Sequence, residues 1–327
     1  MLISAEHTPT LTVANVTARS RSNVRLVYYS LANSPDGSCE QQWIQSIRSL
    51  RRYNRSIPVW LFLFNHGSGE LLREAERQNV QVQFLGDYCE FLQRAHPRGS
   101  ILALYPTLHK FLVLPNLPLQ PLTQLLFLDC DTFFFDDVSL LFDASGTHDW
   151  YAREEPRSLR SPHAHNPKHI DELLLKYITD KEALRSVLPF NTGVCLMNHG
   201  IWQKLAGLRC AFLDFAWRFL CGQELSGHKY ELVDPGLRPA VLDALTDQDR
   251  SRALPYPSEN PWILDEIALW LSLGHVPHFS LGTFSFEQVA QGGEFEPMLA
   301  SPQRSILAHY FSGGEEEFFA SVPSIAA

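Results

Sequence analysis

Short apolar runs of strand length alternate with segments of helical periodicity near the start of this chain. Strands are predicted at Arg25 to Leu31, Ile57 to Phe64 and Val80 to Leu85, with helices between them at Glu40 to Tyr53 and Glu70 to Gln78. Such alternation is typical of βαβ units, in which helices connect parallel strands and cover the sheet. The pattern predicts a Rossmann-like α/β fold with a mixed, mostly parallel central sheet and flanking helices.

A fourth strand is predicted at Gln124 to Leu128, after a helical stretch at Thr107 to Leu114. Its residues are apolar without alternation, which is typical of a central strand that is covered on both faces. Beyond residue 150 the predicted elements are a helix at Ile170 to Ile178, a strand at Asn191 to Asn198, and helices at Ile201 to Leu220 and Trp262 to Leu273.

The length of the chain and its N-terminal composition indicate the domain organisation. Residues 1–23 are rich in Ser and Thr and lack periodicity, so we expect a flexible tail there. The chain has 327 residues, 45% of them apolar, and can bury the core of one large α/β domain or two small ones. We expect one domain over residues 24–327, built from the halves 24–150 and 151–327.

Cysteine usage, charge and hydropathy exclude several classes of protein. The six cysteines are scattered without a CxxC pair, so neither a zinc knuckle nor a disulfide framework is indicated, and a cytoplasmic location is expected. The net charge of −9 argues against nucleic acid as a partner, because clustered Lys and Arg bind phosphate backbones. No apolar run approaches the roughly 20 residues of a membrane helix, so no transmembrane segment is expected.

Two carboxylates follow the fourth strand directly. Asp129 and Asp131 are separated only by Cys130, at the point where a buried strand is expected to end. Ligands of open α/β sheets bind outside the carboxyl ends of the strands. Two close carboxylates repel each other, and a hard divalent cation relieves the repulsion. We therefore expect Mn²⁺ or Mg²⁺ at this pair, bridging to a diphosphate that it stabilises as a leaving group.

Two other interpretations of the aspartate pair stay open on the residues alone. Asp is favoured in turns, so Asp129 and Asp131 could simply cap the connection to the next element. The pair could also belong to the phosphatase motif DxDxT, which follows a first strand. Thr132 comes directly after the second Asp, however, and the pair lies far into the chain, so this second interpretation fits the sequence poorly.

Four separated segments carry a resemblance to a known family. They are Leu108-His109-Lys110-Phe111, then Asp129-Cys130-Asp131 with Asp137 and Val138-Ser139-Leu140-Leu141-Phe142 after it, then Phe190-Asn191-Thr192-Gly193-Val194, and Ile306-Leu307-Ala308-His309-Tyr310-Phe311-Ser312-Gly313. In this order they resemble the motifs of retaining GT-A glycosyltransferases of the glycogenin and lipopolysaccharide galactosyltransferase type, glycosyltransferase family 8. The resemblance implies a GT-A fold and hexose transfer, with retention, from a nucleoside diphosphate sugar to a hydroxyl acceptor.

The resemblance also implies a ligand set and a divided site. His309 would be the third metal ligand beside Asp129 and Asp131, and a neutral imidazole suits Mn²⁺ better than Mg²⁺. Residues 24–150 would bind the nucleotide, with a UDP-sugar favoured as donor. Residues 151–327 would hold the acceptor, whose identity the sequence does not give, and would complete the metal site.

Catalytic and donor-binding roles follow from the same motifs. Asn191, Asp265 and Glu266 are the expected catalytic residues, although Glu266 stands where the family usually has Gln. At the end of the first strand, the Tyr29 ring could pack on a base and Asn33 could read its edge. The expected donor-binding residues are Tyr29, Ser30, Asn33, Lys110, Asp129, Cys130, Asp131, Asn191, Gly193, Asp265 and Gly313.

One departure from the family affects the diphosphate. The family usually has a Lys after the Gly of its last motif, but Gly313 is followed by Gly314 and three glutamates. Binding of the diphosphate would then rely on the metal, on backbone amides, or on Lys110 or Arg153. Histidines at 163, 165 and 169 have irregular spacing and are interpreted as solvated or acceptor-facing.

Two alternative functions are compatible with the same fold. A sugar nucleotidyltransferase would carry a Gly-rich, basic loop after the first strand, and Ser34-Pro35-Asp36-Gly37-Ser38 has no basic residue. A nucleotide-sugar-binding protein without turnover is the other alternative. It would not need the complete set of metal ligands that the sequence predicts.

Overall fold

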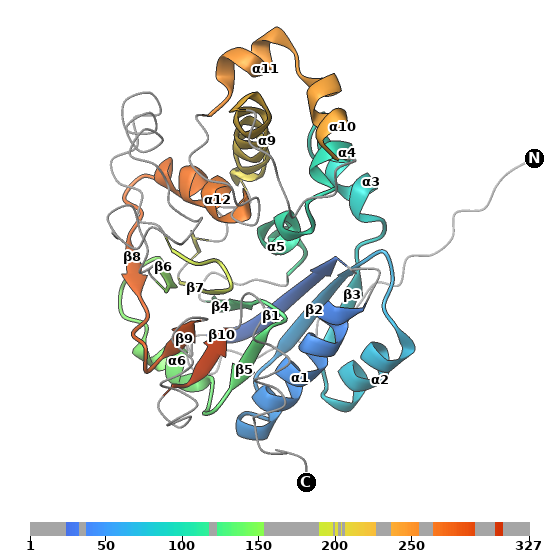
Figure 1. The fold of residues 1–327 in the computed structure, drawn as a ribbon. Coiled ribbons are helices and arrows are strands. Elements are labelled where there is room, and N and C mark those ends of the chain that lie inside the picture. The colour runs from blue at the N-terminus through green and yellow to red at the C-terminus, as the bar shows by residue number, and fades with distance from the viewer. Residues whose placement is uncertain are drawn as a thin grey trace, which may run out of the picture.

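The computed structural model of the chain describes residues 24–32, 37–117, 123–153, 190–198, 200–201, 204, 207–226, 237–254, 264–291 and 305–309. They form a mixed α/β structure with a seven-stranded sheet in the order β3-β2-β1-β4-β7-β6-β8 (Figure 1). Strands β1 to β4 are mutually parallel, whereas β7 runs antiparallel to both β4 and β6. The predicted fold class, with its mostly parallel central sheet, is confirmed.

The bounds of the elements follow the sequence pattern closely in the first half of the chain. The strands of the large sheet are β1 (Val24–Ala32), β2 (Val59–Phe64), β3 (Gln81–Phe84), β4 (Thr123–Leu128), β6 (Trp150–Ala152), β7 (Val194–Met197) and β8 (Leu281–Thr283). The connecting helices of the βαβ units are α1 (Ser38–Tyr53) and α2 (Gly69–Arg77). Each helix begins at a suitable residue: Gly37 adopts a left-handed φ of 71° before α1, and the Ser68 side chain accepts from the Leu71 amide in α2.

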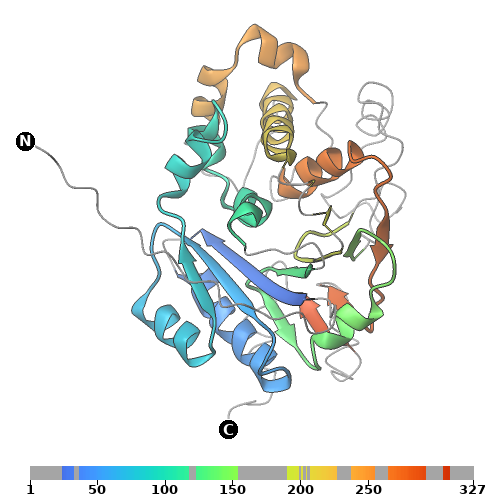
Figure 2. The same ribbon diagram turned by 180° about the vertical axis from the view of Figure 1, so that it is seen from behind.

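Both faces of the sheet are covered by apolar side chains. On one face, Val27, Tyr29 and Leu126 pack with Trp43 and Ile47 of α1. The opposite face belongs to a second apolar cluster, which also contains the buried side chains of α9 (Arg209–Ser226) and α12 (Leu264–Gly274). Figures 1 and 2 show α1 and α2 beneath the sheet in these views, and α9 to α12 above it. The sheet is therefore buried on both faces, which explains why its strands are apolar without alternation.

The remaining helical elements are short and connect or extend this core. They are α3 (Tyr88–Gln93), α4 (Gly99–Leu102), η1 (Pro106–Leu108), α5 (His109–Leu112), η2 (Leu114–Asn116), α6 (Ser139–Ala144), α10 (Leu237–Ala244) and α11 (Asp247–Arg252). No helix within the described ranges is both long enough and apolar enough to cross a membrane.

A second, three-stranded sheet lies beside the large one. Its order is β5 (Thr132–Phe134), β10 (Leu307–His309) and β9 (Val289–Gln291). β10 pairs antiparallel with β5 and parallel with β9. Through this small sheet, β10, the last strand of the described residues, is paired with β5, which follows β4 in the chain.

Several predicted elements differ from the structure. The helix expected at Thr107 to Leu114 is found as three short turns, η1, α5 and η2, with Pro106 as the first residue of η1 and Pro115 inside η2. Of the helix expected at Ile201 to Leu220, the described residues 201, 204 and 207 are helical, and α9 begins at Arg209 after a turn at Leu208. The strand expected at Asn191 is limited to β7, which begins at Val194. The expected tail at 1–23 and the helix at 170–178 lie outside the described residues.

Candidate metal site

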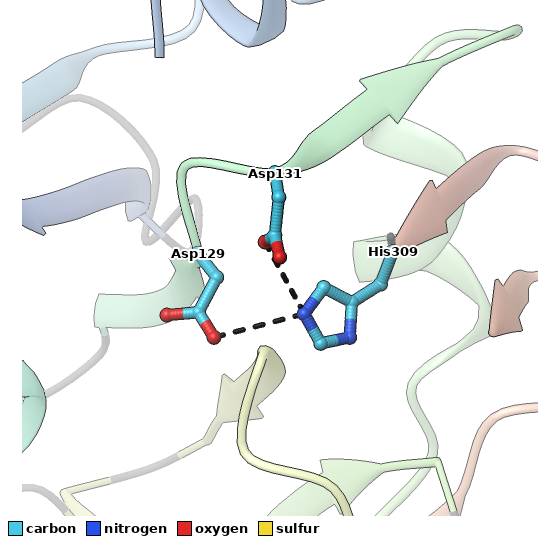
Figure 3. Close-up of side chains that lie close together, drawn as sticks. All are labelled: Asp129, Asp131 and His309. Atoms are coloured by element: carbon cyan, nitrogen blue, oxygen red, sulfur yellow. Dashed lines mark ion pairs between the residues drawn. The ribbon is translucent and has the colours of Figure 1, made fainter. Parts of the chain in front are cut away.

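Three side chains converge beyond the carboxyl end of β4. The Asp129 and Asp131 carboxylates point toward the imidazole of His309 (Figure 3), and the potential ligand atoms of the three residues lie within 4.8 Å of one another. His309 Nε2 is 3.3 Å from Asp131 Oδ1 and 3.7 Å from Asp129 Oδ2. The residues that the sequence predicted as metal ligands are thus brought together by the fold.

Strand pairing positions these three residues. His309 is the last residue of β10 and lies opposite Thr132 in the antiparallel ladder with β5, directly beside Asp131. Asp129 extends the ladder between β4 and β7, where its amide donates to the Gly193 carbonyl at 2.8 Å. The two backbone pairings meet at residues 129–132, so main-chain hydrogen bonds position the backbone of all three ligands.

Gly193 allows the approach of the imidazole. A Cβ atom at this position would lie 2.0 Å from Cε1 and 2.2 Å from Nε2 of His309. Distances under 3 Å are sterically impossible without movement, and the His309 ring is itself 3% exposed and cannot move into solvent. The glycine therefore provides the space that the third ligand occupies.

Lys110 connects this group to a second acidic residue. Its ammonium lies 2.8 Å from Asp129 Oδ2 and 3.1 Å from Asp265 Oδ2. The lysine is held by α5, whose Lys110 carbonyl accepts a hydrogen bond from the Tyr28 hydroxyl of β1 at 3.2 Å. Lys110 therefore provides a fixed positive charge between the aspartate pair and the start of α12.

The charges of this cluster shift the pKa of its members in opposite directions. Burial opposes the protonated form of His309, but the Asp131 and Asp129 carboxylates outweigh it and raise the pKa of the imidazole to about 9. Burial likewise opposes the charge of Asp129, but Lys110 and His309 outweigh it and lower the pKa of this carboxyl to about 2. Two cations, Lys110 and protonated His309, thus balance the aspartates when no metal is bound.

A polar layer lies next to the aspartate pair, between β7 and α12. The Asn191 amide donates to Glu266 Oε1 at 3.0 Å and its carbonyl oxygen accepts from the Gly193 amide at 2.8 Å. The Thr192 hydroxyl donates to Asp265 Oδ2 at 2.8 Å. Asp265 and Glu266 are 1% and 4% exposed. The three predicted catalytic residues therefore lie together where the start of α12 meets the turn before β7, in two hydrogen-bonded pairs, Asn191 with Glu266 and Thr192 with Asp265.

At the end of β1, where the nucleotide was expected, the side chains of Tyr29 and Ser30 hydrogen-bond to other residues of the protein. Tyr29 is fully buried, and its hydroxyl hydrogen-bonds to Ser46 Oγ at 2.9 Å. Ser30 is 5% exposed and hydrogen-bonds to His109 Nδ1 at 2.8 Å. Asn33 and Gly313 lie outside the described residues. The roles of these four residues in donor binding stay predictions.

Two further predicted residues have defined partners. The Cys130 thiol donates to Gln42 Oε1 of α1 at 3.2 Å. The Arg153 guanidinium donates to the Phe284 carbonyl at 3.0 Å, so part of its donor capacity is used within the protein. A role for Arg153 in binding the diphosphate is a prediction that this contact does not test.

Sequence reasoning assigned no role to His109, Thr192 or Ser46, although all three are buried around the site. His109 is a neutral residue here, because burial and the neighbouring Lys110 lower its pKa to about 3. Thr192 lies inside the segment that suggested Asn191 and Gly193, so its position in that motif was the available signal. Ser46 had no comparable signal, because its contact with Thr132 depends on the packing of α1.

The donor set fits a divalent cation. Ligand atoms about 2.1 Å from one ion lie about 3 Å apart in neighbouring coordination positions, and the observed separations of 3.3 and 3.7 Å are close to this. Two carboxylates and one imidazole suit Mn²⁺, which accepts both oxygen and nitrogen ligands. The residues present therefore match the ion that the sequence predicted.

Comparison with known proteins gives structural similarity alone. No protein-family model matches the chain, and no curated protein sequence matches it. Among solved structures, the chain is similar to the galactosyltransferase LgtC in complex with donor and acceptor sugar analogs, at 13% identity and a TM-score of 0.47, over 92% of this chain and 96% of that chain.

Two other solved structures are similar over most of this chain. One is the bifunctional glycosyltransferase WbbM in its apo form, at 12% identity and a TM-score of 0.49, over 94% of this chain and 51% of that chain. The other is mouse xyloside xylosyltransferase 1 in its apo form, at 10% identity and a TM-score of 0.43, over 88% and 97% of the two chains. At such scores the reaction of this chain has to be inferred from its own residues.

Replacement of Gly193 by Ala should weaken metal binding. The added methyl group would overlap the His309 ring and force the third ligand away from the aspartates. We expect the dissociation constant for Mn²⁺, measured by calorimetry, to rise about tenfold or more. The matched control is Gly207→Ala, where a Cβ would meet no atom within 4 Å. Unchanged Mn²⁺ affinity in a folded Gly193→Ala protein would contradict the assignment of His309.

Binding of Mn²⁺ should release a proton from His309. The pKa of about 9 means that the imidazole is protonated at pH 7 in the metal-free protein, and a metal can bind only the neutral ring. Affinity should rise about tenfold per pH unit up to about pH 9 and change little above it.

Calorimetry in two buffers with different ionisation enthalpies measures this release, which should be about one proton at pH 7. His309→Gln should abolish it, whereas the exposed control His66→Gln should not. Proton release that persists in His309→Gln would show that another group is displaced.

Proposed function

We propose that the chain is a metal-dependent glycosyltransferase of the GT-A type that moves a hexose from a nucleoside diphosphate sugar to a hydroxyl acceptor. The observation that carries this proposal is the convergence of Asp129, Asp131 and His309 at the carboxyl end of β4. Held by these three residues, a divalent cation would stabilise the negative charge of the diphosphate as this group leaves the sugar. The order of the sequence motifs supports the same reaction.

The polar layer beside this ligand group supports a sugar-binding role. Asp265, Glu266 and Asn191 present carboxylate and amide groups, which hydrogen-bond the hydroxyls of a hexose well. Lys110 joins this layer to Asp129 through its two ion pairs. A donor whose diphosphate contacts the metal would thus have its sugar next to α12. A UDP-sugar is favoured as the donor on the resemblance.

Retention of the anomeric configuration belongs to the same proposal. An inverting enzyme needs a carboxylate base aimed at the acceptor hydroxyl, opposite the leaving diphosphate. Asp265 Oδ2 is instead engaged by the Lys110 ammonium and the Thr192 hydroxyl. In the proposed reaction Asp265 and Asn191 hold the sugar in place. An oxygen of the leaving diphosphate takes the proton of the acceptor hydroxyl, which attacks from the same face of the sugar.

Metal-dependent turnover is the experiment that tests the proposal. The purified chain is incubated with UDP-, GDP- and ADP-sugars and Mn²⁺, and release of the nucleoside diphosphate is measured with and without a panel of hydroxyl acceptors. Asp131→Asn should reduce the rate about a hundredfold or more, because it removes a metal ligand. The control Asp136→Asn changes the same charge at an exposed position in the same segment.

Each outcome of this assay distinguishes among the possible functions. Full activity in excess chelator would contradict metal dependence. Formation of a nucleotide sugar from a nucleoside triphosphate and a sugar phosphate would identify a nucleotidyltransferase instead. Stoichiometric donor binding without any hydrolysis or transfer would identify a binding protein.

The stereochemical part of the proposal has its own test. Proton NMR of the first-formed product from an α-linked donor should show an α-linked product. Asp265→Asn should slow transfer without giving a trappable glycosyl-enzyme. A β-linked first product would contradict retention and would identify Asp265 or Glu266 as the general base.

A further inference from the structure

Three consecutive residues of the turn before β7 face different parts of the candidate site. The Asn191 side chain donates to Glu266, and Gly193 provides the space for the His309 ring. Thr192 lies between these two residues and is 1% exposed. The turn therefore reaches the polar layer and the metal site at the same time, with the Thr192 hydroxyl enclosed between them.

The backbone of this turn is fixed on both sides of Thr192. The Asn191 amide donates to the Arg153 carbonyl at 2.9 Å, and the Gly193 carbonyl accepts from the Asp129 amide at 2.8 Å. The Gly193 amide also donates to the Asn191 side chain at 2.8 Å. Threonine is β-branched, which restricts its χ1 angle. The direction of the Thr192 hydroxyl is therefore determined by a well-anchored main chain and a stiff side chain.

The helix α12 is held against the same turn. Trp270 Nε1 donates to the Phe190 carbonyl at 2.9 Å, and the centroids of the two rings lie 6.1 Å apart. Both side chains are buried. Because this contact fixes α12 beside the turn, Asp265 in the first turn of the helix stays within reach of the Thr192 hydroxyl.

Asp265 is held through one of its two carboxylate oxygens. Oδ2 accepts from the Thr192 hydroxyl at 2.8 Å and pairs with the Lys110 ammonium at 3.1 Å. Within the described part of the chain, no donor is found for Oδ1. Two donors on one oxygen restrict the rotation of the carboxylate and leave the other oxygen as an acceptor.

Lys110 alone is a poor device for this orientation. An ammonium is a point charge on a flexible stem, and it pairs with a carboxylate in many geometries. The Lys110 ammonium is also shared with Asp129, at 2.8 Å. The Thr192 hydroxyl is the more directional of the two donors, since its position depends on the anchored turn.

We propose that Thr192 is a positioning residue of the transfer reaction, which orients Asp265 so that its Oδ1 atom accepts a hydrogen bond from a hydroxyl of the donor sugar. The inference rests on the proposed function, because that function makes a sugar the ligand of Asp265. Thr192 is not a catalytic residue in this proposal, since it acts through Asp265.

Orientation of Asp265 affects the rate more than the affinity. The sugar has to be aligned with the acceptor while its bond to the diphosphate breaks, and a small misplacement of a group that holds it costs rate. The contacts of the diphosphate do not depend on Thr192, so they would still bind the donor. Loss of the Thr192 hydroxyl should therefore lower kcat more than it raises the KM for the donor.

The test compares Thr192→Val, which keeps the branched shape and removes the donor, with the unaltered protein. The substrate is the fastest of the UDP-, GDP- and ADP-sugars. With Mn²⁺ present, kcat for release of the nucleoside diphosphate should fall about tenfold or more, and the donor KM should change less than about threefold. The Mn²⁺ dissociation constant should stay within about twofold, because the hydroxyl donates to Asp265 and not to a metal ligand.

Three comparisons separate positioning from a general loss of packing. Thr192→Ser keeps the hydroxyl and should restore most of kcat. Thr123→Val removes a hydroxyl that is also 1% exposed, at the start of β4, and should leave kcat and KM unchanged. In an Asp265→Ala background, Thr192→Val should lower kcat no further, because the group through which it acts has been removed.

Three results would overturn the inference while the proposed function stands. They are an unchanged kcat in Thr192→Val, a Thr192→Ser protein that is as slow as Thr192→Val, or an undiminished effect of Thr192→Val in the Asp265→Ala background. Circular dichroism checks the fold of each variant, and Thr192→Ala takes the place of Thr192→Val if the valine variant does not fold. Absence of Mn²⁺-dependent release by the unaltered protein would instead contradict the proposed function, and the inference would fail with it.

Discussion

Repulsion between the carboxylates of Asp129 and Asp131 is the interaction on which the arrangement of this molecule depends. The two groups are one residue apart in sequence, and Asp265 and Glu266 lie buried nearby. Such a concentration of negative charge is stable only beside cations. Lys110 supplies one, and His309 supplies a second as long as its imidazole is protonated. A bound divalent cation would replace the second, because it requires the imidazole in its neutral form.

The fold positions these charges through backbone pairing at the junction of its two sheets. β7 runs antiparallel to β4 and brings Gly193 beside Asp129, and the small sheet brings His309 beside Asp131. Gly193 has no side chain to block the imidazole. α1 holds the opposite side of the same segment through Ser46 and Ser49. The ligand positions therefore depend on elements from both ends of the described chain.

The sequence was sufficient to predict the parallel part of the fold, since β1, β2, β3 and β4 are apolar runs separated by amphipathic helices. It was also sufficient for the aspartate pair, which follows such a strand directly. The three-residue strands β5, β9 and β10 were not predicted, because three residues are too few to show a periodicity. α11 was not predicted, although Thr246 and Asp249 form a capping box that marks its start.

Side-chain networks were predicted less well than individual residues, for a physical reason. Asn191, Asp265 and His309 each stand in a recognisable local motif. The contact of Lys110 with two aspartates, and the hydrogen bonds between α1 and residues 130–134, depend on how distant segments pack. Tyr29 illustrates the same limit, because an aromatic residue at a strand end can face either a ligand or the core, and here it packs on Trp43.

Coordination of one ion by Asp129, Asp131 and His309 is tested most directly by asking whether a nitrogen of His309 binds the ion that the aspartates hold. Pulsed EPR of the protein loaded with one equivalent of Mn²⁺ detects a directly coordinated ¹⁴N through its modulation of the electron spin echo. Coordination by His309 predicts this modulation in the unaltered protein and its loss in His309→Gln. Stoichiometrically bound Mn²⁺ without ¹⁴N modulation, or modulation that persists in His309→Gln, would contradict it.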